Sequence, residues 1–136
     1  MKSNKGFTII ELLIVMVIIA LLSSIALNSY ISYRKKARLT AIALPYAEDC
    51  TRQAVEYCLE LKPSSSVNID ISSLSLPSCQ SRSLGLYNTS LSFSGNFRCE
   101  PAGHISSGTI QARLSTISDF SAICDITSTG IRCYIQ

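Results

Sequence analysis

The feature that most constrains this chain is an apolar run near its amino terminus that contains one carboxylate. From Phe7 to Leu27 every residue is apolar or small except for Thr8, Glu11, Ser23 and Ser24. A run of this length can cross the ~30 Å hydrocarbon core of a bilayer as a helix. Because a carboxylate in such a segment is costly, Glu11 indicates a functional site.

The rest of the chain suits one small domain pinned by disulfides. The sequence has 136 residues, which leaves too little after the apolar run for two ordinary domains. Six cysteines lie outside the run, and their even number predicts an oxidising compartment and up to three disulfides. They are Cys50, Cys58, Cys79, Cys99, Cys124 and Cys133. With no Cys-x-x-Cys pair and one histidine, the sequence predicts no metal site, haem or other cofactor.

A helix is predicted to continue well beyond the apolar run. Small and apolar residues recur at three- and four-residue intervals from Ala37 to Leu61, with charged residues on the other faces. Pro45 is expected to bend this helix without ending it, because good helix formers resume at once. Pro63 and the serines after it supply the stop. We therefore expect one long helix over about residues 7–61.

The carboxyl-terminal half is predicted to form an antiparallel sheet. Residues 62–84 are rich in Ser, Asn and Pro and indicate a surface loop with at most one short turn or strand. From 86 to 136, short stretches of period two alternate with Gly and Asn. The predicted strands are 91–94, 96–99, 109–114, 120–127 and 130–135. The expected fold class is α+β, with the long helix covering one face of the sheet.

The last hairpin has the most determined register. If the chain turns within 127–130, Cys124 faces Cys133, Asp125 faces Arg132, and the apolar side chains share one face. This register predicts a disulfide between Cys124 and Cys133. Pairing of either cysteine elsewhere stays open, because connectivity cannot be deduced from sequence alone.

The other four cysteines are harder to pair. Cys50 and Cys58 are eight residues apart, hence about 12 Å apart along a helix, which is too far for a bond between them. The partners left are Cys79 and Cys99. We expect Cys58 to pair with Cys79 and Cys50 to pair with Cys99.

No catalytic constellation is recognisable in the sequence. His104 is the one histidine, and no nucleophile is placed beside it by a motif. A lone loop histidine is most often simply solvated. We therefore expect a protein that is not an enzyme.

The leader Met1–Gly6 differs from an ordinary secretory signal, in which a small-residue cleavage site follows the apolar region. Here the small residue, Gly6, precedes it. Cleavage after Gly6 would keep the helix on the mature protein and create an amino group on Phe7, four residues from Glu11. Because positions four apart share a helix face, that ammonium could neutralise a carboxylate of its own or a neighbouring chain.

The stretch from Lys5 to Val15, KGFTIIELLIV, resembles the class III signal sequence of type IV pilins and type II secretion pseudopilins. The resemblance covers roughly residues 2–40. It implies a pilin fold, cleavage by a prepilin peptidase between Gly6 and Phe7, and N-methylation of Phe7. Glu11 matches the family's assembly glutamate, which meets the amino terminus of an adjacent subunit. The implied parts are a leader at 1–6, a transmembrane and filament-core half of the helix at 7–31, and a globular head at 32–136.

The resemblance also implies a function and partners. The chain is expected to be a subunit of a type IV pilus, a helical homopolymer used in surface adhesion, motility or DNA uptake. Implied partners are prepilin peptidase, an assembly ATPase with its inner-membrane platform, and an outer-membrane secretin. The precursor is expected to cross the bacterial inner membrane once, amino terminus inside, before joining the extracellular pilus. The alternatives are a type II secretion pseudopilin, a minor pilin, or a membrane-tethered binding domain that does not polymerise.

Two features depart from the family pattern. Many members have a helix-breaking glycine and proline in the membrane run, where this chain has Ala20 and Asn28. Their absence predicts a more continuous helix. In addition, a basic cluster from Arg34 to Arg38 follows the run, against only Lys2 and Lys5 before it, which opposes the positive-inside rule. The predicted orientation therefore rests on the resemblance. The cluster could pair with the acidic residues from Glu48 to Glu60 of a staggered neighbour, or both could simply be solvated.

Overall fold

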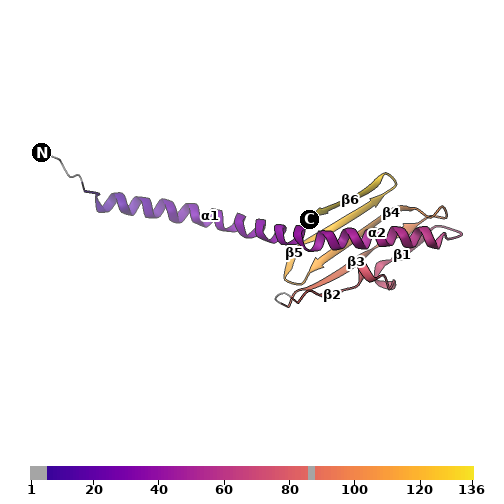
Figure 1. Cartoon of the computed structure of the whole chain (residues 1–136). Helices are drawn as coiled ribbons and strands as arrows, with labels where there is room; N and C mark the ends of the chain where they lie inside the picture. Colours follow the sequence, from indigo (N-terminus) through magenta and orange to yellow (C-terminus); the bar gives the residue numbers. More distant parts are fainter. Residues whose placement is uncertain (1–5, 86–87) are drawn as a thin grey trace. The chain divides into compact units, whose positions relative to one another are not determined.

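The computed structural model describes residues 6–85 and 88–136, so most of the leader lies outside the described part. The chain divides into two units, Met1–Arg34 and Lys35–Gln136. Two helices, α1 (Ile9–Ala41) and α2 (Ala43–Leu61), precede the strands (Figure 1). The expected α+β arrangement is confirmed, with α2 packed on an antiparallel sheet.

Helix α1 is continuous through the two positions that depart from the family pattern. Its 33 residues include Ala20 and Asn28 without interruption. This continuity follows from the absence of proline in the run, because each residue keeps its backbone donor. The helix begins at Ile9 rather than at the expected Phe7, and Thr8 occupies the position before its first turn.

The single break between the helices is explained by Pro45. Proline has no N–H to donate to the carbonyl four residues earlier, which belongs to Ala41, and its ring crowds that carbonyl. Accordingly, α1 ends at Ala41, and α2 resumes at Ala43. Helix α2 ends at Leu61, as predicted, where Lys62 adopts a left-handed conformation with φ of 36° and donates its N–H to the Cys58 carbonyl.

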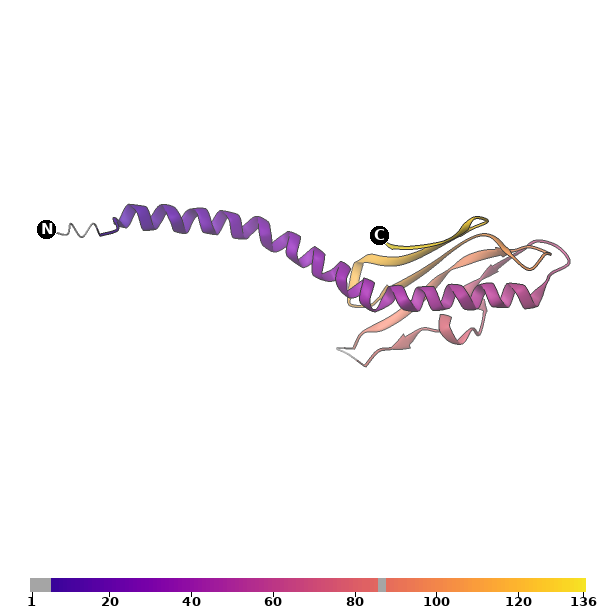
Figure 2. The same cartoon turned by 45° about the horizontal axis from the view of Figure 1, so that its top comes forward.

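The sheet has six strands and is antiparallel throughout. The order along the sheet is β1-β3-β4-β5-β6, and the short strand β2 also pairs with β3. The strands are β1 (Val67–Asp70), β2 (Arg82–Ser83), β3 (Ser90–Cys99), β4 (Ile105–Leu114), β5 (Ile117–Thr127) and β6 (Gly130–Ile135). Figure 2 shows α2 lying across one face of this sheet.

The core lies between α2 and the covered face of the sheet. The buried helix residues are mostly small and bring the helix backbone close to larger strand residues such as Phe97 and Ile110. On α2 they are Ala43, Ala47, Cys50, Thr51, Ala54 and Cys58. The predicted apolar face is therefore right from Ala47 to Cys58. It is wrong at its ends, because Ala37, Ala41 and Leu61 are exposed, and Leu39 is the buried residue of α1.

Strand predictions failed where glycine and short strands were involved. The predicted break at Gly95 does not occur, and β3 runs through it. A Cβ at Gly95 would lie 2.0 Å from the Thr109 carbonyl oxygen, so glycine permits close strand contact there. The segment predicted as a loop contains β1, β2 and two 3₁₀ turns, Ile71–Ser73 and Pro77–Cys79.

Three disulfides join the described cysteines, and two of them differ from the expected pairs. Cys50 bonds Cys79 and Cys58 bonds Cys99, which reverses the predicted assignment. The reason is the direction of the chain after α2. Val67 at the start of β1 pairs with Cys99 beside the end of the helix, and the chain then runs back to bring Cys79 against Cys50 in the middle of α2.

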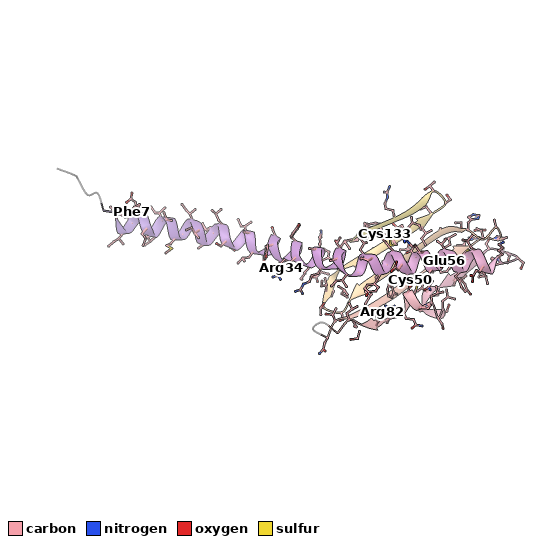
Figure 3. All side chains as sticks on the ribbon, in the orientation of Figure 1. Phe7, Arg34, Cys50, Glu56, Arg82 and Cys133 are labelled. Carbon is pink, nitrogen blue, oxygen red and sulfur yellow. A yellow bond between two sulfur atoms is a disulfide. The ribbon has the colours of Figure 1, made fainter. Side chains whose placement is uncertain are left out.

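The carboxyl-terminal hairpin has the predicted register. Cys124 pairs with Cys133, Asp125 with Arg132, and Ile126 with Ile131. A disulfide joins Cys124 to Cys133, whose Cα atoms are 4.0 Å apart. Cys50 on α2 and Cys133 on β6 are labelled in Figure 3. The hairpin therefore carries its own covalent link, whereas the other two disulfides fasten α2 to the rest of the C-terminal unit.

Candidate assembly site

None of the described side chains of the amino-terminal unit, residues 6–34, is buried. Every residue from 6 to 34 is exposed, and Phe7 and Ile9 retain 88% and 86% of their accessible surface. Phe7 lies just before the first turn of α1 (Figure 3). Apolar surface on this scale is covered in a working protein by lipid or by other chains.

The helix meets the requirements for a membrane span by length and composition. Within the described residues, the stretch Ile9–Leu61 contains one 18-residue window with a mean hydropathy of 2.8, none of it buried. An apolar helix of this kind fits a membrane anchor. The C-terminal unit, in contrast, buries its own apolar side chains.

Thr8 and Glu11 form a capping box at the start of α1. The Glu11 N–H donates to the Thr8 hydroxyl at 3.3 Å, and the Thr8 N–H donates back to the Glu11 Oε2 at 3.1 Å. The Thr8 hydroxyl also donates to the same Oε2 at 3.0 Å. These bonds satisfy amides that the first helical turn leaves free.

The sequence analysis singled out Glu11 but not Thr8, which forms hydrogen bonds with it. The signal was present, because Thr-x-x-Glu before an apolar run is the pattern of a capping box. The four-residue spacing instead predicts that Phe7 and Glu11 share a helix face. Because the helix begins at Ile9, Phe7 lies outside it in this chain with its leader attached, and Thr8 is the residue that contacts the carboxylate.

Gly6 has open space around it. A Cβ built on Gly6 meets no atom within 4 Å. Steric space alone would therefore tolerate a larger residue at this position.

The basic cluster after the membrane run is partly engaged within the C-terminal unit. The Lys35 ammonium forms an ion pair with Asp119, and this contact lowers the pKa of the Asp119 carboxyl. The Lys36 Nζ lies 4.9 Å from the centroid of the Phe120 ring, a cation–π arrangement. These two lysines therefore fix the carboxyl-terminal end of α1 to β5. Fewer basic residues of the cluster are therefore available for an ionic contact with a neighbouring chain.

The described side chains include no cluster that could hold a metal ion. Within residues 6–85 and 88–136, no group of three or more His, Cys, Asp or Glu residues is placed to hold a metal ion. His104 is exposed in the turn between β3 and β4, where its carbonyl accepts the Glu100 N–H at 2.9 Å.

Known proteins resemble both the amino-terminal segment and most of the chain. The family model of the prokaryotic N-terminal methylation motif matches residues 1–27. The type IV wide pilus major component PilA4 of Thermus thermophilus is 34% identical over 110 residues, which cover 81% of this chain and 80% of that protein. No solved structure matches the chain.

Other relatives match mainly the amino-terminal part. A probable minor fimbrial protein of Dichelobacter nodosus is 44% identical over 59 residues, which cover 43% of this chain and 36% of that protein. The type IV major alpha-pilin of Moraxella bovis is 46% identical over 43 residues, or 32% of this chain and 27% of that protein. The long match to a major pilus component, together with the methylation motif and the helix-on-sheet fold, shows that the chain belongs to the type IV pilin family.

Proposed function

We propose that this chain is the structural subunit of a surface filament, cleaved after Gly6 and polymerised through its apolar helix. Pilins are structural proteins rather than enzymes, and the family implies processing by prepilin peptidase and polymerisation. One observation carries the proposal: the residues from 6 to 34 are all exposed on an apolar helix, whereas residues 35–136 enclose their own core. Packing against other copies would cover the exposed helix.

In this proposal, moving the apolar helix out of the membrane requires energy supplied by other proteins. A helix gains little by leaving lipid for a bundle of similar apolarity, so hydrophobicity alone cannot drive assembly. An assembly ATPase and a platform protein in the inner membrane are the proposed source of that work. A secretin in the outer membrane would let the filament reach the surface, for adhesion, motility or DNA uptake.

Glu11 would select the correct docking position. An unpaired carboxylate in an apolar environment costs several kcal/mol. Before cleavage, Thr8 supplies two donors to Oε2. Cleavage after Gly6 would create an ammonium on Phe7, and in the filament the Phe7 ammonium of a neighbouring copy would pair with Glu11. Only a copy seated at the right height would make this contact.

The proposal is tested by Glu11→Leu in cells that lack the native gene. The variant is expected to be stable, processed and membrane-inserted, yet to give at least about tenfold fewer filaments, because docking loses its ionic contact. Filaments are counted by electron microscopy, and processing is followed by the mass of the subunit. Ser23→Ala is the matched control, because it removes a polar group from the same run without removing a charge.

Two results would contradict the proposal. Normal filament numbers with Glu11→Leu would show that the carboxylate is not needed for docking. If the protein isolated from cells still carried Met1–Gly6, the proposed cleavage would be wrong. Gly6→Phe is expected to block cleavage and leave the leader attached, although Gly6 has free space around it.

The major pilin role is favoured over the minor pilin and pseudopilin roles. The relative that covers 81% of this chain is named a major component, whereas the probable minor fimbrial protein covers 43%. Deletion separates the possibilities. Loss of all surface filaments supports a major pilin, a reduced number of otherwise normal filaments a minor pilin, and loss of secreted proteins alone a pseudopilin.

A further inference from the structure

A polar groove of about 590 Å³ crosses β1, β3 and β4. Its strand residues alternate with Phe97, Cys99 and Ile110, which are buried in the core beneath α2. The groove therefore opens on the face of the sheet that α2 does not cover. It is lined by Ser66, Asn68, Asn96, Arg98, Ser107, Gly108 and Thr109.

Arg98 lines this groove and is oriented by a neighbouring carboxylate. Its Nε lies 3.2 Å from the Glu100 Oε1. Glu100 in turn accepts hydrogen bonds from the hydroxyls of Ser66 and Ser106, both at 2.8 Å. These bonds, and to a smaller extent the charge of Arg98, lower the pKa of Glu100. The guanidinium is thus oriented from one side, and among the described residues its two Nη groups have no partner.

The cross-strand register surrounds the guanidinium with further polar groups. Asn68 on β1 and Ser107 on β4 lie directly opposite Arg98. Asn96 and Thr109 form the next pair along the same face. Within the described part of the chain, the side-chain amides of Asn68 and Asn96 make no hydrogen bond, so their donors and acceptors are available to a ligand.

The lining defines the class of ligand. A guanidinium edge with two free Nη groups fits a carboxylate in a bidentate arrangement. Amides and hydroxyls on both sides suit a ligand that is rich in hydroxyl groups. No aromatic or aliphatic side chain lines the groove, so its lining is mainly polar and favours a polar ligand over a lipid. Asp70, opposite Asn96, would repel a phosphate group, which can carry two negative charges, more than a carboxylate group of a saccharide, which carries one.

We propose that this groove binds a saccharide that carries a carboxylate, with Arg98 as the residue that contacts the acid. The site lies wholly within residues 35–136, so binding does not depend on polymerisation. If the proposed filament forms, the site recurs in every subunit, and a weak contact is multiplied along the fibre.

The test uses the full chain, purified in detergent micelles so that no filament is needed. The probe is trigalacturonic acid, and its fully methyl-esterified form is the uncharged control. Calorimetric titration is expected to show binding of the acid and at least about tenfold weaker binding of the ester, because a charged hydrogen-bonded pair is lost.

Variants then assign the contact. Arg98→Gln is expected to weaken binding of the acid at least about tenfold, and Arg98→Lys to weaken it less, because charge remains but the planar fork is lost. Arg113→Gln is the matched control, since Arg113 is exposed on β4 outside the groove. It should bind as the native chain does.

Three results would overturn the proposal: no binding of trigalacturonic acid, equal binding of acid and ester, or equal binding by Arg98→Gln and the native chain. Failure of the chain to polymerise would leave this test intact. Conversely, absence of saccharide binding would leave the filament role intact.

Discussion

The two units of this chain solve the problem of apolar surface in different ways. The unit from Met1 to Arg34 exposes every described side chain of a long apolar helix. The unit from Lys35 to Gln136 buries small helix residues against a sheet and closes the contact with disulfides. Only the second unit is complete by itself. The first requires lipid or further copies, and this contrast is the physical basis of an assembling subunit.

The two units also differ in the property that a substitution is expected to change. In the C-terminal unit, a substitution should change the free energy of unfolding. In the amino-terminal unit, a substitution of similar size should leave that free energy unchanged and affect membrane insertion or assembly. The following predictions test this division.

Removing the disulfide between α2 and β3 should have the largest effect on stability. The Cys58→Ala/Cys99→Ala variant opens a loop with a sequence separation of 41, whereas Cys124→Ala/Cys133→Ala opens one of 9. Loop-closure entropy predicts losses of about 4 and about 2.6 kcal/mol, respectively. Denaturant unfolding of the full chain in micelles, followed by tyrosine circular dichroism, measures both. Equal losses would contradict the entropic reasoning.

Enlarging a buried alanine should destabilise only the C-terminal unit. Ala47 is fully buried between α2 and the sheet, whereas Ala20 is exposed on α1. Ala47→Leu is expected to lower the free energy of unfolding by about 1–3 kcal/mol through overpacking. Ala20→Leu, the matched control, should not change it. If both variants unfold alike, the packing contrast between the units is wrong.

Removing the helix cap should have a smaller, local effect. Thr8→Ala deletes the hydroxyl that accepts the Glu11 N–H, and the loss of an N-cap costs about 1 kcal/mol. Hydrogen exchange in micelles should show the Glu11 amide exchanging about fivefold faster, with the amides of α2 unchanged. Thr8→Ser keeps the hydroxyl and should restore protection. Protection that survives in Thr8→Ala would exclude the capping role.

Acid should weaken the C-terminal unit modestly. The hydrogen bond and charge of Lys35 lower the pKa of Asp119 from 3.8, and the hydroxyls of Ser66 and Ser106 lower that of Glu100 from 4.5. A carboxyl with a lowered native pKa stabilises the fold above its ordinary pKa, and this contribution is lost as pH falls through the native value.

Unfolding midpoints should therefore stay level from neutral pH to about 4.5 and decrease below it. Asp119→Asn should reduce the size of that decrease. A midpoint that rises on acidification would contradict the assigned direction.

Where local pattern determined the structure, the sequence was sufficient. The end of α2 at Leu61, the disturbance of the helix near Pro45 and the register of the last hairpin all followed from neighbouring residues. The family could also be recognised from the sequence, because its motif, KGFTIIELLIV, is one contiguous stretch. Thr8 could have been found in this way, since its capping pattern is also local.

Where the route of the chain determined the structure, the sequence was insufficient. The pairing of Cys50 with Cys79 depends on β1 running back from the end of α2, and Val67 and Ile69 gave too weak an alternation to reveal that strand. Gly95 was interpreted as a break, although its role is a close contact with Thr109. The groove around Arg98 depends on register between strands distant in sequence.

The most direct test of the central claim is mass spectrometry of filaments sheared from the cell surface. We expect this chain as a principal component, beginning at N-methylated Phe7, with all six cysteines oxidised in the three pairs described above. Surface filaments without this chain, with the chain found only in the membrane and still beginning at Met1, would contradict the claim that its exposed helix is completed by further copies.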